Sequence, residues 1–240
     1  MLHARDIISI IEMIFYIPTL ITCGVVCFRH GFRNGSGWIY TLVLCLVRIA
    51  GAICQFVSHS NHSTGLIKAT LVLNSIGLGP LMFSTLAFLS RFVQFVNTKS
   101  KPVVTKKHLI IIRLVISAGI GLSISGAMDA LSSGATQVPT NSRVGIILII
   151  VAYVSLVVLF LVYARRVSLL PRKERRVPLA IFASLPLILV RLVYSACVVF
   201  LHNSAFNILT GSVAVLVVMS VIEEFAVVGI YVLLGFLVDR

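Results

Sequence analysis

The chain has 240 residues, of which 59% are hydrophobic and 11% are charged, and its mean hydropathy is +1.09. These values lie outside the range of soluble domains, so a soluble enzyme or binding module is excluded. The formal net charge of +13 does not indicate nucleic-acid binding, because lysine and arginine gather in particular loops between apolar runs. We therefore expect a membrane protein without a nucleic-acid partner.

Seven apolar runs follow one another along the chain, each with at least the ~20 residues that a helix needs to span a bilayer. They predict an all-α bundle of seven transmembrane helices in a single domain, residues 1–240. The helices are expected at residues 7–28, 37–57, 66–96, 108–131, 143–164, 177–201 and 209–236. The third run contains NSIGLGP, residues 74–80, whose glycines and proline predict one kinked helix.

Basic residues follow the first, third and fifth predicted helices and are sparse in the alternate loops. Because positive loops mark the cytoplasmic side of a membrane, we expect a lumenal N-terminus and a cytoplasmic C-terminus. The first apolar run is too long for a cleavable signal peptide. We expect that helix to target the chain to a membrane, and we assign the endoplasmic reticulum.

Five charged residues interrupt the apolar runs at mid-membrane or lumenal depth. They are Glu12, Arg48, Arg191, Glu223 and Glu224. A charge at bilayer depth costs about 2.5 to 3.5 kcal/mol even on a lenient insertion scale, so such residues usually face the bundle interior and serve a function. We expect them to share one cavity.

Helical spacing supports this convergence, because polar and aromatic residues recur on the same helix faces as the charges. Glu12 and Tyr16 are one turn apart, and Glu224 shares a face with Ser220 and Tyr231. Arg48, Arg191 and Asn74 are candidates to orient the carboxyl groups. The candidates to line the cavity are Phe15, Tyr16, Tyr153, Tyr194 and Phe225.

The charge count predicts a proton donor. Three carboxyl groups face two guanidinium groups, and burial favours the neutral form of a carboxylic acid, so one carboxyl is expected to keep its proton. Glu223, Glu224 and Glu12 are the candidate acids. Glu223 and Glu224 point about 100° apart on a helix, so at most one is expected to reach the cavity centre. The alternative is that the arginines clasp the glutamates only to lock the helices together.

Other residues predict no cofactor and no metal. The histidines fall at helix ends or in loops, the aspartates stand alone, and the five cysteines lie inside helices. Clustered aspartates that bind magnesium and a diphosphate are absent from the sequence. Ser117, Gly121 and Ser125 form a stripe of small residues that predicts a helix-packing face.

Three stretches resemble the small seven-helix membrane-bound cyclases of fungal meroterpenoid biosynthesis, of the ascofuranone and macrophorin type. They are RHGFRNGSGWIYTLVLCLVRIAGAICQ at 29–55, LNSIGLGPLMFSTLAFLSR at 73–91 and IEEFAVVGIYVLLGF at 222–236. The resemblance implies a terpene cyclase in which a carboxylic acid protonates an epoxide or terminal alkene of a prenyl chain. That chain, a farnesyl group, is attached to an aromatic or quinone head.

The implied substrate is a lipophilic prenylated molecule that enters from membrane lipid, and the aromatic candidates would offer π faces to its cation. Two alternatives remain. Seven helices with an outside N-terminus is also a receptor topology, although the short cytoplasmic loops leave little surface for a signalling partner. Buried Glu and Arg also suit a small-solute or proton transporter, although the sequence shows no inverted repeat.

Overall fold

The computed structural model of the chain describes residues 4–30, 36–60, 64–99, 104–133, 139–167, 170–171, 174–201 and 213–238. Within these ranges every regular element is a helix, and seven helices are long and apolar enough to cross a membrane. The predicted all-α, multi-pass membrane bundle is thus confirmed. The lumenal placement of the N-terminus stays a prediction.

The helix bounds agree with the predicted runs to within a few residues, except in the third and seventh runs. The elements are α1 Ala4–His30, α2 Ser36–Ser60, α3 Thr64–Ile76, α4 Leu78–Lys99, α5 Lys106–Ser133, α6 Thr140–Ala164, α7 Arg176–Phe200, α8 Val213–Leu216, the π-helix η3 Val217–Val221, and α9 Ile222–Leu237. The last three are continuous and form the seventh spanning segment.

The third run breaks at Gly77, which separates α3 from α4. Pro80 lies in the first turn of α4, where a missing N–H leaves no helical hydrogen bond unmade. The 22 residues of α4 are by themselves long enough to span, so α3 extends the segment beyond one bilayer-spanning length. The expected kink is therefore a true interruption of the helix.

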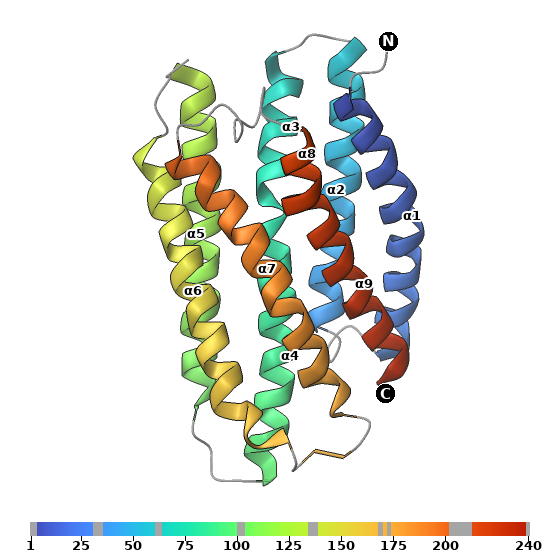
Figure 1. Ribbon diagram of the computed structural model, residues 1–240, viewed down its shortest axis with the longest axis vertical. Coiled ribbons are helices and arrows are strands. Elements are labelled where there is room, and N and C mark those ends of the chain that lie inside the picture. Colours follow the sequence, from blue (N-terminus) through green and yellow to red (C-terminus); the bar gives the residue numbers. More distant parts are fainter. Residues whose placement is uncertain are drawn as a thin grey trace.

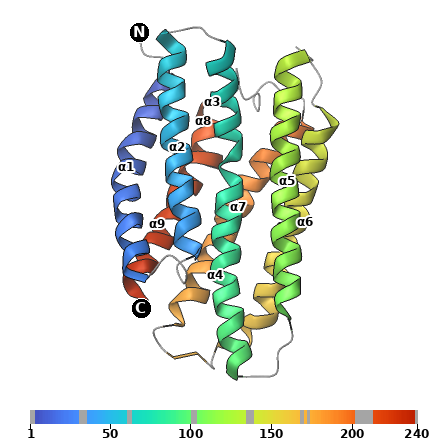
Figure 2. The ribbon, with the colours of Figure 1, turned by 180° about the vertical axis from the view of Figure 1, so that it is seen from behind.

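Helix α4 lies at the centre of the bundle and contacts α2, α5, α6 and α7 (Figure 1). The pair α5 and α6 forms one edge and the pair α1 and α2 the other, while α7 and α9 pack on each other across one face (Figures 1 and 2). The start of α1 and the end of α9 lie at opposite ends of the bundle (Figure 1). An odd number of membrane crossings requires this.

The outer surface of the bundle is apolar and its interior carries polar side chains. Large hydrophobic residues such as Ile14 and Phe28 are 69% and 77% exposed. Charged residues Glu12, Arg48 and Glu224 are buried instead. This distribution suits a surface covered by lipid, because the exposed side chains meet hydrocarbon and the interior provides partners for polar groups.

A set of hydrogen bonds fixes the second half of α9 against its neighbours. Trp38 Nε1 donates to the Tyr231 carbonyl oxygen at 2.9 Å, and His30 Nε2 lies 2.8 Å from the Gly235 carbonyl oxygen. The rings of His30 and Trp38 stack with centroids 4.5 Å apart. The Tyr231 hydroxyl pairs with Thr85 Oγ1 at 2.7 Å. These contacts with α1, α2 and α4 hold α9 in a defined rotation about its axis.

The seam between α5 and α6 corrects one expectation. Ser117 and Gly121 are exposed, and a Cβ built on Gly121 would meet nothing within 4 Å. The packed face instead contains Gly119 and Gly126, both buried. The Cβ of an alanine at 119 would lie 3.0 Å from the Gly145 carbonyl oxygen of α6. The sequence therefore correctly predicted that α5 packs through a face of small residues, but it placed that face on the wrong side of the helix.

Candidate functional site

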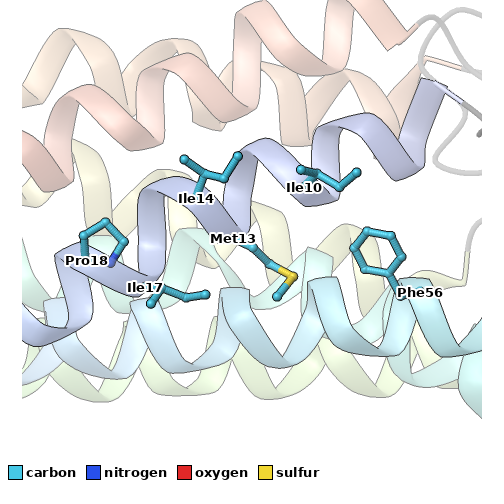
Figure 3. Close-up of a pocket in the computed structure, with 6 residues that line it drawn as sticks. All are labelled: Ile10, Met13, Ile14, Ile17, Pro18 and Phe56. Atoms are coloured by element: carbon cyan, nitrogen blue, oxygen red, sulfur yellow. The ribbon is translucent and has the colours of Figure 1, made fainter.

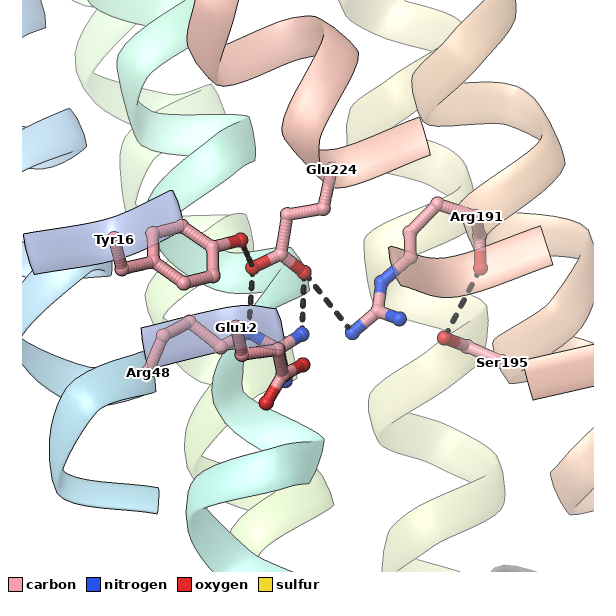
Figure 4. Close-up of polar contacts among 6 residues, drawn as sticks. All are labelled: Glu12, Tyr16, Arg48, Arg191, Ser195 and Glu224. Atoms are coloured by element: carbon pink, nitrogen blue, oxygen red, sulfur yellow. Dashed lines mark hydrogen bonds and ion pairs between the residues drawn. The ribbon is translucent and has the colours of Figure 1, made fainter. Parts of the chain in front are cut away.

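Five buried residues from four helices form an ionic cluster inside the bundle: Glu12 and Tyr16 on α1, Arg48 on α2, Arg191 on α7 and Glu224 on α9. Their side chains point toward one another around the Glu224 carboxylate (Figure 4). The exposed fraction of each residue is between 1% and 7%. The structure therefore brings together four of the five intramembrane charges that the sequence singled out.

The Glu224 carboxylate is the centre of the ionic cluster. Arg48 donates two parallel hydrogen bonds to it, from Nε to Oε1 at 2.5 Å and from Nη2 to Oε2. The Tyr16 hydroxyl donates a third hydrogen bond to Oε1 at 2.7 Å. Bidentate, charge-assisted pairs of this kind are the strongest class of protein hydrogen bonds. Glu224 is thus held as an ionised carboxylate.

The other two charges of the ionic cluster are held more loosely. Arg191 Nη2 lies 3.5 Å from Glu224 Oε2, and Arg48 Nη1 lies 3.7 Å from Glu12 Oε1. Among the described residues, the buried Nε of Arg191 has no hydrogen-bond partner. Arg191 therefore keeps donor capacity that its contact with Glu224 does not use.

At Gly77, in the break between α3 and α4, the backbone lies close to the ionic cluster. A Cβ at this position would lie 2.5 Å from Arg48 Nη2 and 3.1 Å from Glu224 Oε2. Any side chain here would displace the guanidinium or the carboxylate. The helix break and the ion pair therefore occupy the same place, and a glycine fits between them.

Glu223 lies outside the ionic cluster. It is only partly buried, yet its Oε2 atom is enclosed and has no hydrogen-bond partner among the described residues. Both glutamates lie in the first turn of α9, which begins at Ile222 directly after the π-helix; the Ile222 N–H bonds to the Val217 carbonyl oxygen. Single π turns recur at functional sites. The two adjacent glutamates are therefore in different settings: Glu224 is paired with Arg48, and Glu223 has an enclosed oxygen without a partner in the described part of the chain.

Three of the five aromatic candidates meet beside the ionic cluster. Phe15 and Phe225 stack with ring centroids 4.0 Å apart, and Tyr16 packs edge-on against Phe225 at 5.3 Å. Tyr194 is buried on α7, one turn after Arg191. Tyr153 on α6 donates its hydroxyl to the Leu185 carbonyl oxygen at 2.9 Å, so that group is already bound to backbone.

Two expectations stay predictions: the orienting role of Asn74 and a shared cavity around the charges. The backbone of Asn74 lies in α3, but its side chain is outside the described part of the structure. An apolar groove of about 560 Å³ is open to the outer surface between α1 and α2 (Figure 3). Its walls are Ile10, Met13, Ile14, Ile17, Pro18 and Phe56, none of them an ionic-cluster residue. The shared cavity expected around the charges stays a prediction.

Among the described residues, no three His, Cys, Asp or Glu side chains are grouped so that they could hold a metal ion. The described carboxylates of the ionic cluster face guanidinium groups instead. The arrangement fixes one carboxylate, at Glu224, and leaves two enclosed polar atoms, Arg191 Nε and Glu223 Oε2, without a partner among the described residues.

Sequence reasoning missed three parts of the site. Gly77 was read only as a helix-weakening residue, although its place in NSIGLGP marked the break. Tyr16 was assigned to the cavity lining, whereas its hydroxyl is a direct ligand of Glu224. The signal for Tyr16 was its position one turn from Glu12. The π-helix has no signal in the sequence, because Val217–Val221 reads as ordinary apolar helix.

No curated protein and no solved structure matches the chain. One family matches residues 2–240, nearly the whole chain, and its description is domain of unknown function DUF7702. The chain therefore belongs to the DUF7702 family.

Proposed function

We propose that this protein is a membrane-bound terpene cyclase, in which Glu223 protonates an epoxide or terminal alkene of a prenylated aromatic or quinone substrate. The observation that carries the proposal is the division of the three intramembrane carboxyl groups. Glu224 and Glu12 face guanidinium groups, whereas Glu223 Oε2 is enclosed without a hydrogen-bond partner among the described residues. The resemblance to small seven-helix meroterpenoid cyclases supplies the reaction class. We place the activity in the endoplasmic reticulum membrane.

The charge balance explains why Glu223 would be the acid. In the ionic cluster two carboxylates, Glu12 and Glu224, balance two guanidiniums, Arg48 and Arg191. A third carboxylate at this depth would be an uncompensated charge, at a cost of about 2.5 to 3.5 kcal/mol or more. Glu223 avoids that cost by carrying a proton. A neutral carboxyl group beside an ionised one is the pattern of enzymes that divide two acids between two roles.

The proposed step is an isomerisation. The Glu223 carboxyl transfers its proton to the epoxide oxygen, the adjacent C–O bond breaks, and the electrons of a neighbouring alkene form a new C–C bond to the cationic carbon. Repetition closes further rings, and the last cation loses a proton to a base. The product keeps the mass of the substrate, and the base can be the Glu223 carboxylate, which restores the acid.

The surroundings of the ionic cluster support this chemistry. Phe15, Tyr16 and Phe225 form a group of rings beside Glu224, and π faces stabilise a cation by about 0.5 to 2 kcal/mol each. The rigid pair between Arg48 and Glu224 would fix α2 against α9, and so hold the segment that carries Glu223. Glu224 then has an orienting role.

The test is an assay of microsomes that contain wild type, Glu223→Gln, Glu224→Gln or Glu12→Gln. Each is incubated with a farnesylated phenol and with its terminal epoxide, and ring closure is followed as an isomer of unchanged mass. Glu174→Gln is the matched control, because Glu174 pairs with Arg91 outside the ionic cluster. We expect wild type and the control to cyclise and Glu223→Gln to lose about 10²-fold or more of the rate.

The outcomes separate the candidate acids. Loss of ring closure only in Glu12→Gln would transfer the acid role to Glu12, whose contact with Arg48 is the looser one. Full activity of both Glu223→Gln and Glu12→Gln would reject the proton-donor proposal. Binding of substrate without any isomer would favour a receptor or a carrier. Protein amounts are compared by size-exclusion chromatography, so that unfolding is not mistaken for inactivity.

A further inference from the structure

The Arg191 guanidinium has a buried N–H donor that no described residue binds. Its residue is 4% exposed, and its single ion pair within the ionic cluster is the 3.5 Å contact of Nη2 with Glu224 Oε2. The buried Nε has no hydrogen-bond partner in the described part of the chain. A guanidinium carries five N–H donors in a fixed fork, and a buried donor without an acceptor is destabilising. An acceptor supplied by a ligand would remove that defect.

The charges around Arg191 restrict what this acceptor can be. Glu12 and Glu224 already balance Arg48 and Arg191. An anionic ligand would leave a net negative charge in the interior of a membrane protein, where uncompensated charge is strongly disfavoured. A neutral oxygen accepts the same hydrogen bond without changing the balance. The acceptor that fits is therefore an uncharged oxygen, and a carbonyl oxygen fits best, because it only accepts hydrogen bonds and brings no O–H donor that would need a further partner.

The location of the donor indicates the kind of molecule. Arg191 lies on α7 and Glu223 on α9, and these two helices pack against each other. Each residue presents one enclosed polar atom without a partner among the described residues, Nε in Arg191 and Oε2 in Glu223. The lipid-facing surface of the bundle is apolar. A ligand that reaches these atoms from the membrane must be lipophilic and must carry a polar group for each of them.

We infer that Arg191 binds the neutral carbonyl oxygen of the substrate's head group, as found in a quinone, an aromatic aldehyde or an aryl ketone. The inference rests on the proposed function, which supplies the prenyl chain of the ligand. The geometry of Arg191 supplies the oxygen that the ligand must carry. It assigns Arg191 to substrate binding and Glu224 to holding Arg191 in place.

The experiment is a binding competition with the full chain in lipid nanodiscs, read by native mass spectrometry. Three probes carry a farnesyl chain on a benzoquinone, a benzaldehyde or an acetophenone, and each competes with farnesylbenzene, which lacks oxygen. We expect wild type to favour at least one carbonyl probe by about tenfold or more, the range for a hydrogen bond to a charged group. In Arg191→Lys that ratio should fall toward one.

The lysine variant is chosen because it keeps the positive charge opposite Glu224 but lacks the planar fork and its Nε–H. Arg113→Lys is the matched control, since Arg113 is exposed on α5, and it should retain the wild-type ratio. Correct folding of each variant is checked by its melting temperature.

Three results would overturn the inference: no preference of wild type for any carbonyl probe, a wild-type ratio in Arg191→Lys, or stronger binding of a farnesylated benzoate anion than of all three neutral probes. Ring closure is measured on the same preparations. Carbonyl preference without cyclisation would count against the proposed function alone, and cyclisation without carbonyl preference would count against this inference alone.

Discussion

Two regions of the bundle hold their helices together by opposite means. In the seam between α5 and α6 the backbones touch, so that a Cβ on Gly145 would lie 2.7 Å from the Ser123 nitrogen and 2.8 Å from the Gly119 carbonyl oxygen. In the ionic cluster α1, α2, α7 and α9 are joined by long charged side chains around Glu224. Close approach of the backbones at glycines joins the helices in the seam, and charged side chains join them in the ionic cluster.

The difference shows where the protein is tolerant and where it is specific. Small-residue packing in a membrane draws on van der Waals contact and needs only close approach. A buried ion pair needs every charge matched, and the loss of one partner leaves the other uncompensated. The seam should therefore respond to added volume, and the ionic cluster to removed charge.

Removal of Arg48 should produce the largest effect. Arg48→Leu deletes both contacts to Glu224 and the 3.7 Å pair with Glu12, which leaves two carboxylates facing Arg191 alone. We expect a loss of about 3 to 5 kcal/mol in the free energy of unfolding, as for other broken buried pairs. Reversible unfolding in mixed micelles measures it.

The double variant Arg48→Leu/Glu224→Leu is the control for this prediction. Replacement of a whole buried pair by apolar residues is often neutral, so the second change should recover part of the lost stability. Recovery demonstrates that the unmatched charge caused the loss. A double variant less stable than Arg48→Leu would instead attribute the loss to packing around the arginine stem.

Substitution by alanine should have different effects on stability at two glycines of α5. Gly126→Ala places a Cβ against the backbone nitrogen of Ser142, so α6 must move, and overpacking of this kind costs about 1 to 3 kcal/mol. Gly121→Ala meets nothing within 4 Å and should be neutral or stabilising by up to about 1 kcal/mol, because alanine favours helix. The melting temperatures of the two variants measure the contrast, and equal values would contradict the assigned packing face.

These two regions also show what sequence can and cannot predict. Small residues lie along two faces of α5. Residues 117, 121 and 125 are four apart, and residues 119, 123 and 126 are four and three apart. Either spacing keeps residues on one face of a helix. Periodicity gives the separation of residues on a face, and the position of the neighbouring helix decides which face is used. That position depends on the whole bundle, so the sequence predicted the wrong stripe.

The ionic cluster was more accessible to prediction, because a charge in an apolar run has few acceptable environments. Glu12, Arg48, Arg191 and Glu224 were selected on that ground, and they contact one another. The choice between Glu223 and Glu224 was left open, because it depends on the rotation of α9. Contacts such as that of Trp38 with Tyr231 set this rotation, and they join residues far apart in the chain.

The smallest expected effect compares two buried tyrosine hydroxyls. Tyr16→Phe removes a hydrogen bond to the Glu224 carboxylate, and Tyr153→Phe removes one to the Leu185 carbonyl oxygen. Hydrogen bonds to charged groups contribute about 1.5 to 3 kcal/mol and neutral ones about 0.5 to 1.5 kcal/mol, so Tyr16→Phe should be the more destabilising by about 1 kcal/mol. The free energies of unfolding of the two variants in mixed micelles measure this difference.

Equal losses in these two variants would mean that Arg48 alone satisfies Glu224, and that Tyr16 is a packing residue. A larger loss in Tyr16→Phe would mean that the carboxylate needs three donors, two from Arg48 and one from α1. In that case α1 is tied to α9 through Glu224 itself. Under the proposed function, ring closure by Tyr16→Phe would then fall together with stability, because the segment that carries Glu223 would lose one of its two fixed neighbours.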